Sequence, residues 1–274
     1  MNGAKLFLFE CGTLRSRSEG VAAGIVGCRL AEAMTEAGAG YSWPVQWYLV
    51  THPKGNVVID GGNSPLRAGG RGAGLGSAVA DVVVMMDPEQ ACVPTLERQG
   101  IDPLSVSYIL QSHLHWDHTG ALASLDAFPN AKVVVDRAEY EFAVSPGWPY
   151  AAAYAQEDFV KDDVVWVHLD EEDGFDLFGD GTIRIWRSPG HSVGHVSFEV
   201  SLDSSGTFLL LADLANTSDH WSGRELPGLL TSGLEMVESV EKLRRIADRR
   251  EATVICGHDP ENWPMYRHAP NFYA

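Results

Sequence analysis

Basic residues are scarce in this sequence. Its 274 residues include 20 lysines and arginines against 37 aspartates and glutamates, which gives a formal net charge of −17. A chain with this charge repels phosphate backbones, so we expect no nucleic-acid partner. Solubility alone accounts for much of the acidity, and bound divalent cations would offset part of it locally.

Cysteine and long apolar runs are scarce too. The four cysteines, Cys11, Cys28, Cys92 and Cys256, form no close C-x-x-C pair. No apolar stretch approaches the roughly 18 residues that span a membrane, and the apolar run that ends at Phe9 is too short for a secretory signal. We therefore expect a reduced, cytoplasmic protein with free thiols and no membrane partner. Cys256, just before Gly257, is either a metal ligand or, more simply, a buried thiol.

Several short, apolar and β-branched segments followed by turn residues predict buried strands. They cover residues 47–50, 57–59, 106–110, 132–135, 182–186, 208–212 and 252–255. Apolar spacing of three and four residues predicts a helix over 234–250 and favours another over 88–99, stopped by Gly100. Residues 16–40 have loose helical spacing, and the glycine-rich residues 64–77 read as a mobile loop. The mixture predicts one α/β (α+β) domain over residues 1–274.

The densest chemistry follows the predicted strand over residues 106–110. There His113, His115, Asp117 and His118 lie within six residues. Imidazole and carboxylate suit zinc, iron or manganese, and a turn at a strand end can direct alternate side chains at two centres. A cluster without function would remove these polar groups from water without partners, at a cost of several kcal/mol. We therefore interpret the segment as a metal site.

Three more candidate ligands follow other predicted strands. They are His191 after Pro189-Gly190, Asp213 after Leu211-Ala212, and His258 after Gly257. Each is weak alone, because a Gly-His pair at a strand end is as often a turn as a ligand. Together they complete the number of donors that two metal ions need.

The motif order D-G-G, H-x-H-x-D-H, P-G-H, D and G-H resembles the metallo-β-lactamase superfamily. The phrases T-H-P-K-G-N-V-V-I-D-G-G-N at 51–63 and Q-S-H-L-H at 111–115 resemble, more narrowly, the N-acyl-homoserine lactonases and their γ-butyrolactone-cleaving relatives. The resemblance covers nearly the whole chain and implies an αββα sandwich with metals at the ends of two sheets. It also implies a role in quorum quenching.

The same resemblance implies a role for each ligand. His113, His115 and His191 would hold one ion, Asp117, His118 and His258 the other, and Asp213 would bridge them. The ions would be two divalent cations, zinc first, with iron, manganese or cobalt as alternatives. Asp60 and His195 would orient ligands, although simple packing explains His195 equally well.

Two metals of this kind can share a water and lower its pKa toward neutrality, so that hydroxide attacks a lactone carbonyl. Asp117 and Asp213 could pass a proton to the leaving alkoxide. The related lactonases usually carry a tyrosine three residues after the bridging aspartate, where its hydroxyl contacts the substrate carbonyl; here Asn216 stands in that place. Either Asn216 performs a modified catalytic task or another group does, which leaves the identity of the lactone open.

Other functions on the same scaffold stay open. A thioester, other ester or amide could be the substrate, whereas a phosphodiester fits poorly with the net charge of −17. A metal-binding sensor without activity is a third alternative, although such proteins usually lose ligands and all seven positions are present here. The alanine-rich residues 16–40 could form a homodimer interface or plain core.

Overall fold

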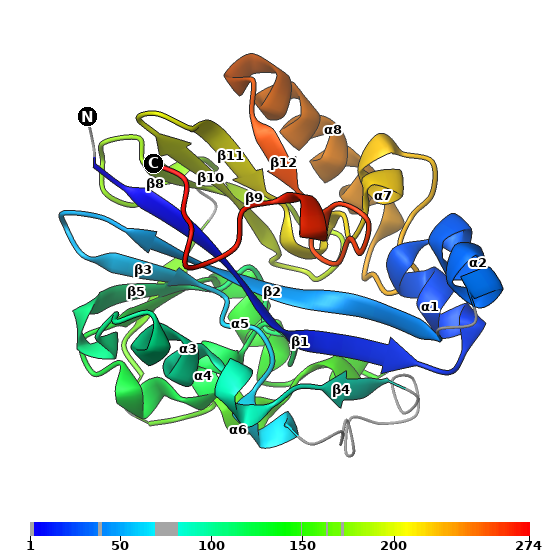
Figure 1. Ribbon diagram of the computed structural model, residues 1–274, viewed down its shortest axis with the longest axis horizontal. Helices are drawn as coiled ribbons and strands as arrows, with labels where there is room; N and C mark the ends of the chain where they lie inside the picture. Colours follow the sequence, from blue (N-terminus) through cyan, green and yellow to red (C-terminus); the bar gives the residue numbers. More distant parts are fainter. Residues whose placement is uncertain (1–2, 38–39, 69–81, 149, 163, 171–172) are drawn as a thin grey trace.

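The computed structural model describes residues 3–37, 40–68, 82–148, 150–162, 164–170 and 173–274. Within these residues two sheets lie face to face, with helices on both outer sides (Figure 1). This arrangement is the αββα sandwich that the sequence led us to expect. Among the described residues we find no helix with the length and apolar character that a membrane span requires.

The larger sheet has the strand order β4-β1-β2-β3-β5-β6-β7. Strands β3, β5, β6 and β7 pair in parallel, while β1 pairs with β2 and β4, and β2 with β3, in antiparallel fashion. The strand bounds are β1 (Lys5–Ser16), β2 (Tyr41–Thr51), β3 (Asn56–Ile59), β4 (Val83–Met85), β5 (Val106–Leu110), β6 (Lys132–Asp136) and β7 (Trp166–Leu169).

The smaller sheet has the order β12-β11-β10-β9-β8. Only its β11 and β12 pair in parallel. The strand bounds are β8 (Phe175–Asp176), β9 (Ile183–Arg187), β10 (Val196–Leu202), β11 (Gly206–Leu210) and β12 (Thr253–Ile255).

The helices cover the outer faces of the sheets. Their bounds are α1 (Glu19–Val26), α2 (Cys28–Ala37), α3 (Cys92–Arg98), α4 (Gly120–Ala123), α5 (Arg137–Ala143), α6 (Gln156–Phe159), α7 (Ser218–Ser222) and α8 (Gly233–Arg250). In Figure 1, α8 lies outside the smaller sheet, α3, α4 and α6 lie beyond the larger one, and α1 and α2 lie at one end beside α7.

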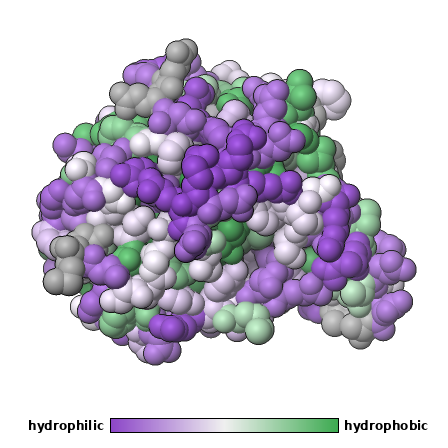
Figure 2. Space-filling model, turned by 90° about the horizontal axis from the view of Figure 1, so that it is seen from above, coloured by the Kyte–Doolittle hydropathy of each residue, from purple (hydrophilic) through white to green (hydrophobic). Residues whose placement is uncertain are grey.

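Three apolar layers of side chains hold the two sheets and the two outer layers of helices together. The central layer lies between the sheets and contains side chains such as Leu8 and Ile59 from one sheet and Phe198 and Leu210 from the other. A second layer joins the larger sheet to its helices, and a third packs α8 against the smaller sheet. Seen from above, the side on which α8 lies in Figure 1, the surface is mainly hydrophilic (Figure 2), as expected for an amphipathic helix that buries one face.

Most predicted elements are present, with shifted bounds. The helix predicted over 234–250 is α8, and each predicted strand overlaps an observed one. The helix predicted over 88–99 is wrong in its first part: residues 88–90 form a separate 3-10 turn, Ala91 is extended, and α3 starts at Cys92. The strand predicted over 208–212 ends at Leu210, because Ala212 takes a left-handed conformation with a φ of 48°.

The two irregular segments have different outcomes. Residues 16–40 contain α1 and α2, and Ala22, Val26, Leu30 and Ala31 are buried within this chain, so part of the segment is core. Of the loop predicted over 64–77, residues 65–67 form a 3-10 turn and residues 69–77 lie outside the described part. Strands β1, β4, β7, β8 and β10 were not predicted.

Candidate metal centre

All seven predicted ligands follow strands, and the two sheets bring those strand ends together. His113, His115, Asp117 and His118 follow β5 of the larger sheet, whereas His191, Asp213 and His258 follow β9, β11 and β12 of the smaller one. The loop before His191 depends on glycine: Gly190 has a φ of 137°, and a Cβ there would lie 2.5 Å from the Met236 backbone. The centre therefore exists only where both sheets meet.

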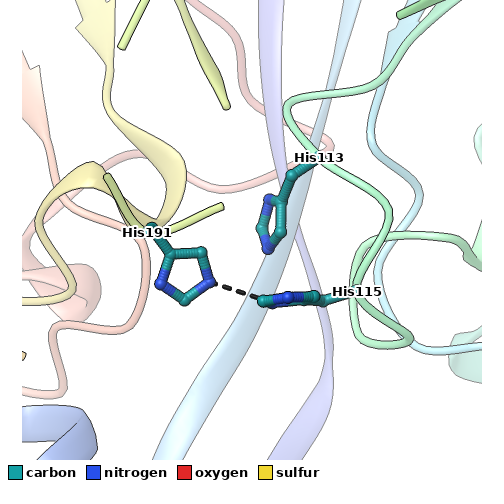
Figure 3. A group of neighbouring side chains, drawn as sticks. All are labelled: His113, His115 and His191. Carbon is teal, nitrogen blue, oxygen red and sulfur yellow. Dashed lines mark hydrogen bonds between the residues drawn. The ribbon is translucent and has the colours of Figure 1, made fainter. Parts of the chain in front are cut away.

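The seven side chains form three overlapping groups whose ligand atoms lie within 4.8 Å of one another. Figure 3 shows the first, in which the rings of His113, His115 and His191 point toward a common centre. We call these three residues the first group, and Asp117, His118 and His258 the second group. His113, His118 and Asp213 make the third combination, which connects the other two.

Asp213 lies between the two groups. Its Oδ2 is 3.3 Å from His191 Nε2, and its Oδ1 is 3.2 Å from His118 Nε2 and 3.3 Å from His258 Nε2. One carboxylate thus faces histidines of both groups. This is the placement that the bridging role requires.

The outward ring nitrogens of four histidines are already occupied. Nδ1 of His118 contacts Asp60 at 3.0 Å and Nδ1 of His113 contacts the Ser112 hydroxyl at 2.9 Å. Nδ1 of His191 contacts the Leu229 carbonyl at 2.9 Å, and that of His258 contacts the Pro44 carbonyl at 2.7 Å. Such contacts select the tautomer whose other nitrogen faces the centre, as in metal-binding histidines.

The inward atoms, by contrast, lack ordinary partners. Nε2 of His113 is buried with no hydrogen bond among the described residues, and Nε2 of His118 has only its contact with the Asp213 carboxylate. Nδ1 of His115 and Nε2 of His191 face each other at 2.9 Å. Buried polar atoms without partners are costly, and a cation bound among these nitrogens and carboxylates would satisfy them. The residues therefore fit a divalent metal ion.

The electrostatics of the centre also suit a cation. Burial, with the neighbouring His118, holds the pKa of His113 well below its ordinary value, which keeps its imidazole neutral. Although burial opposes it, the nearby His258 and His118 hold the pKa of Asp213 well below its ordinary value. Burial lowers the pKa of His258, but Asp213 and Asp117 together outweigh it and raise this pKa to about 10. The carboxylates thus draw positive charge into the site.

Of the two residues expected to orient ligands, Asp60 contacts a ligand ring directly, whereas His195 lies farther from the centre. Asp60 accepts from the Ser112 amide at 2.7 Å and from the Ser112 hydroxyl at 2.9 Å, besides its contact with His118. His195 is buried, contacts the Ser188 hydroxyl at 2.8 Å and lies 5.2 Å from the His113 ring. It belongs to none of the three ligand groups found among the described residues, and neither does Cys256.

Asn216, the expected substrate contact, has a partner elsewhere. It is buried, and its side-chain amide donates to the Ile25 carbonyl in α1 at 2.9 Å. The neighbouring Thr217 hydroxyl donates to the Val26 carbonyl at 3.3 Å. The segment after Asp213 therefore holds the end of α1, and a direct catalytic role for Asn216 stays a prediction.

A small, largely apolar pocket with a volume of about 40 Å³ opens beside the centre. It is lined by Leu14, Ile25, Trp43, Val82, His115, Trp116, Asp117, Ala153, Asp213, Leu229 and His258. Sequence reasoning did not find these apolar lining residues, because they come from separate elements and each looks like ordinary core. A signal was present only in Trp116, which lies inside the ligand segment.

Comparison with known proteins places the chain in a family. The model of the metallo-beta-lactamase superfamily matches residues 40–258. The chain is 40% identical to the N-acyl homoserine lactonase AttM of Agrobacterium fabrum strain C58 over the full length of both. Its fold matches a structure of Bacillus thuringiensis AiiA with N-decanoyl-L-homoserine bound at the active site, with a TM-score of 0.82, 24% identity and full coverage of both chains.

A second solved structure, an N-acyl homoserine lactone hydrolase with the product N-hexanoyl-L-homoserine at its catalytic metal centre, matches with a TM-score of 0.81 and 23% identity over the full length of both chains. The convergent ligands and the full-length likeness agree. This chain therefore belongs to the metallo-beta-lactamase superfamily and, within it, to the N-acyl homoserine lactonases, a family of metal-binding hydrolases.

Proposed function

We propose that the protein opens the lactone ring of an N-acyl homoserine lactone or a related γ-lactone, with two divalent ions at the centre. The observation that carries the proposal is the convergence of seven buried ligands on a shared carboxylate, beside an apolar pocket. The relatives support the substrate class, since they are named for it and two solved relatives hold an N-acyl homoserine.

His113, His115 and His191 would hold one ion, Asp117, His118 and His258 the other, and Asp213 would face both. Zinc suits this set of imidazoles and carboxylates best, and iron, manganese and cobalt suit it as well. When bound, such ions polarise a carbonyl and lower the pKa of water toward neutrality. The four cysteines are free, which is consistent with the cytoplasmic location that we include in the proposal. We also propose a quorum-quenching role and a single domain.

The chain's own residues would position the substrate and move a proton. Leu14, Trp43 and Leu229 offer an apolar wall to an acyl chain and exclude water from the reacting ester. The Asp117 carboxylate lines this pocket, and its Oδ2 lies 3.4 Å from His258 Nε2. Asp213 lines the same pocket, so either carboxylate could take the proton that the attacking water releases and hand it to the alkoxide that leaves when the ring opens.

The experiment is a substrate panel with purified, zinc-loaded protein. γ-Butyrolactone, N-acyl homoserine lactones of increasing acyl length and a set of thioesters are supplied while proton release is followed. We expect metal-dependent release with at least one lactone and its loss after chelation. Release from thioesters alone would assign a different hydrolase, and no release from any lactone would refute the proposal.

A further inference from the structure

A buried glutamate lies behind the metal centre and contacts none of its ligand atoms. Glu139, in α5, is fully buried. Its Oε1 accepts from the Leu114 amide at 3.0 Å and from the Tyr154 hydroxyl at 3.3 Å, and its Oε2 accepts from the Gly194 amide at 3.1 Å. Burying a carboxylate is expensive unless donors surround it, so this arrangement calls for an explanation.

The two amides belong to the two loops that carry the first group. Leu114 stands between His113 and His115, and Gly194 lies three residues after His191. The three histidines converge in Figure 3, where the His191–His115 contact spans the gap between the loops. The Glu139 carboxylate therefore joins the backbones of the two loops on the side away from the point where their histidine side chains meet.

Tyr154 strengthens this connection. Its ring lies edge-on to the ring of His115, with the centroids 4.8 Å apart. The two residues also form an isolated antiparallel bridge, and the neighbouring Trp116 amide donates to the Ala153 carbonyl at 3.0 Å. The same tyrosine thus contacts both the ligand ring and the carboxylate of Glu139.

Helix α5 gives the carboxylate a rigid base. Its first residue follows Asp136, whose Oδ1 accepts from the Ala138 amide at 2.9 Å and whose Oδ2 accepts from the Arg187 guanidinium at 2.9 Å. Asp136 ends β6 and Arg187 ends β9, so this pair connects the two sheets. Gly194 lies directly on α5, since a Cβ there would be 2.4 Å from the Glu139 amide nitrogen.

We propose that Glu139 is a positioning residue that sets the distance between the His113–His115 segment and the His191 loop, and so supports the ion of the first group selectively. The second group has its own support in Asp60, which contacts His118 directly. The inference rests on the proposed metal centre, but it concerns which ion depends on which outer residue rather than the substrate.

Glu139→Gln tests the proposal with little change in volume. The amide would place an N–H opposite the Leu114 or the Gly194 amide, so one loop loses its acceptor while the other keeps it. Zinc affinity is measured by competition with a chromophoric chelator. We expect one ion at wild-type affinity and the other weakened about 10- to 100-fold, the usual effect of removing an outer partner of a ligand.

Glu141→Gln is the matched control, because Glu141 is exposed on the same helix and the change removes the same charge. It should hold both ions as the wild type does. Unchanged affinity for both ions in Glu139→Gln, or equal weakening of both, would overturn the proposal. If Glu139→Gln yields no folded protein by circular dichroism, Tyr154→Phe decides, with selective weakening of one ion expected and wild-type affinities for both overturning it.

The proposed lactonase activity can fail separately. A wild-type protein that binds two ions but opens no lactone would refute the function and leave the metal titration of Glu139→Gln fully interpretable. Conversely, if the protein opens lactones but Glu139→Gln leaves the affinity for both ions unchanged, the proposed function stands and this inference is refuted.

Discussion

The two ligand groups have the same plan but different support. Each takes two ligands from residues 113–118 and one from a loop of the smaller sheet. In the second group a carboxylate, Asp60, contacts the ring of His118 directly. In the first group the rings contact a hydroxyl and a backbone carbonyl, and the carboxylate of Glu139 acts through backbone amides.

This difference has a chemical consequence. A carboxylate on the far nitrogen of an imidazole raises the basicity of the ring as a ligand, whereas a carboxylate on backbone amides controls only where the loop lies. We therefore expect the second group to be sensitive to the charge of its outer residue and the first group to its length and acceptor geometry.

Asp213→Asn should affect the two ligand groups alike, because Asp213 faces histidines of both groups. We expect both ions to bind more weakly and lactone turnover to fall on the order of 10²- to 10⁴-fold, the range for loss of a group that acts on protons in the reaction. Metal analysis after dialysis and steady-state kinetics measure the two effects. Asp248→Asn, an exposed change on α8, is the control, and weakening confined to one ion would contradict the shared role.

Asp60→Asn should weaken the binding of the ion in the second group and leave the ion of the first group nearly unaffected. Asp60 has a φ of 63°, which asparagine tolerates, so the backbone should survive the change. We expect about 10- to 100-fold lower affinity for one ion, the effect of losing an outer partner, with a smaller effect on the other through Ser112. The opposite pattern is expected for Glu139→Gln, and spectra of cobalt-substituted protein can show which ion each variant loses. Loss of the same ion in both variants would contradict the assignment.

Asn216→Ala should leave both groups unchanged and disturb only the pocket. Its amide holds the end of α1, and Ile25 lines the pocket. Loss of one neutral hydrogen bond is worth about 0.5–1.5 kcal/mol, so we expect KM for long-chain lactones to rise about 2- to 10-fold, with kcat and metal content unchanged. Thr217→Val, which removes the neighbouring bond to Val26, should behave alike. A large fall in kcat at constant KM would instead show that Asn216 contacts the reacting carbonyl.

The central strands and α8 could be predicted from local pattern because they are short apolar runs or an amphipathic helix. The long strand β1 was missed, since its apolar stretch is interrupted by Glu10 and Gly12, where the pairing with β2 shifts register. Strand β10 was missed because Ser197 and Glu199 are polar yet buried. Such residues are satisfied by side chains of the neighbouring strand, as Glu199 is by Trp186 and Arg184 of β9.

By itself the sequence determined the chemistry of the centre: which side chains can bind a metal, and that each follows a strand. That much is local, because ligand type and strand pattern are written in neighbouring residues. Only the tertiary structure decided that Glu139 joins the two loops of the first group and that Asn216 holds α1. Those contacts use backbone amides and carbonyls, which every residue carries, so nothing in the order of side chains marks them until folding brings the segments together.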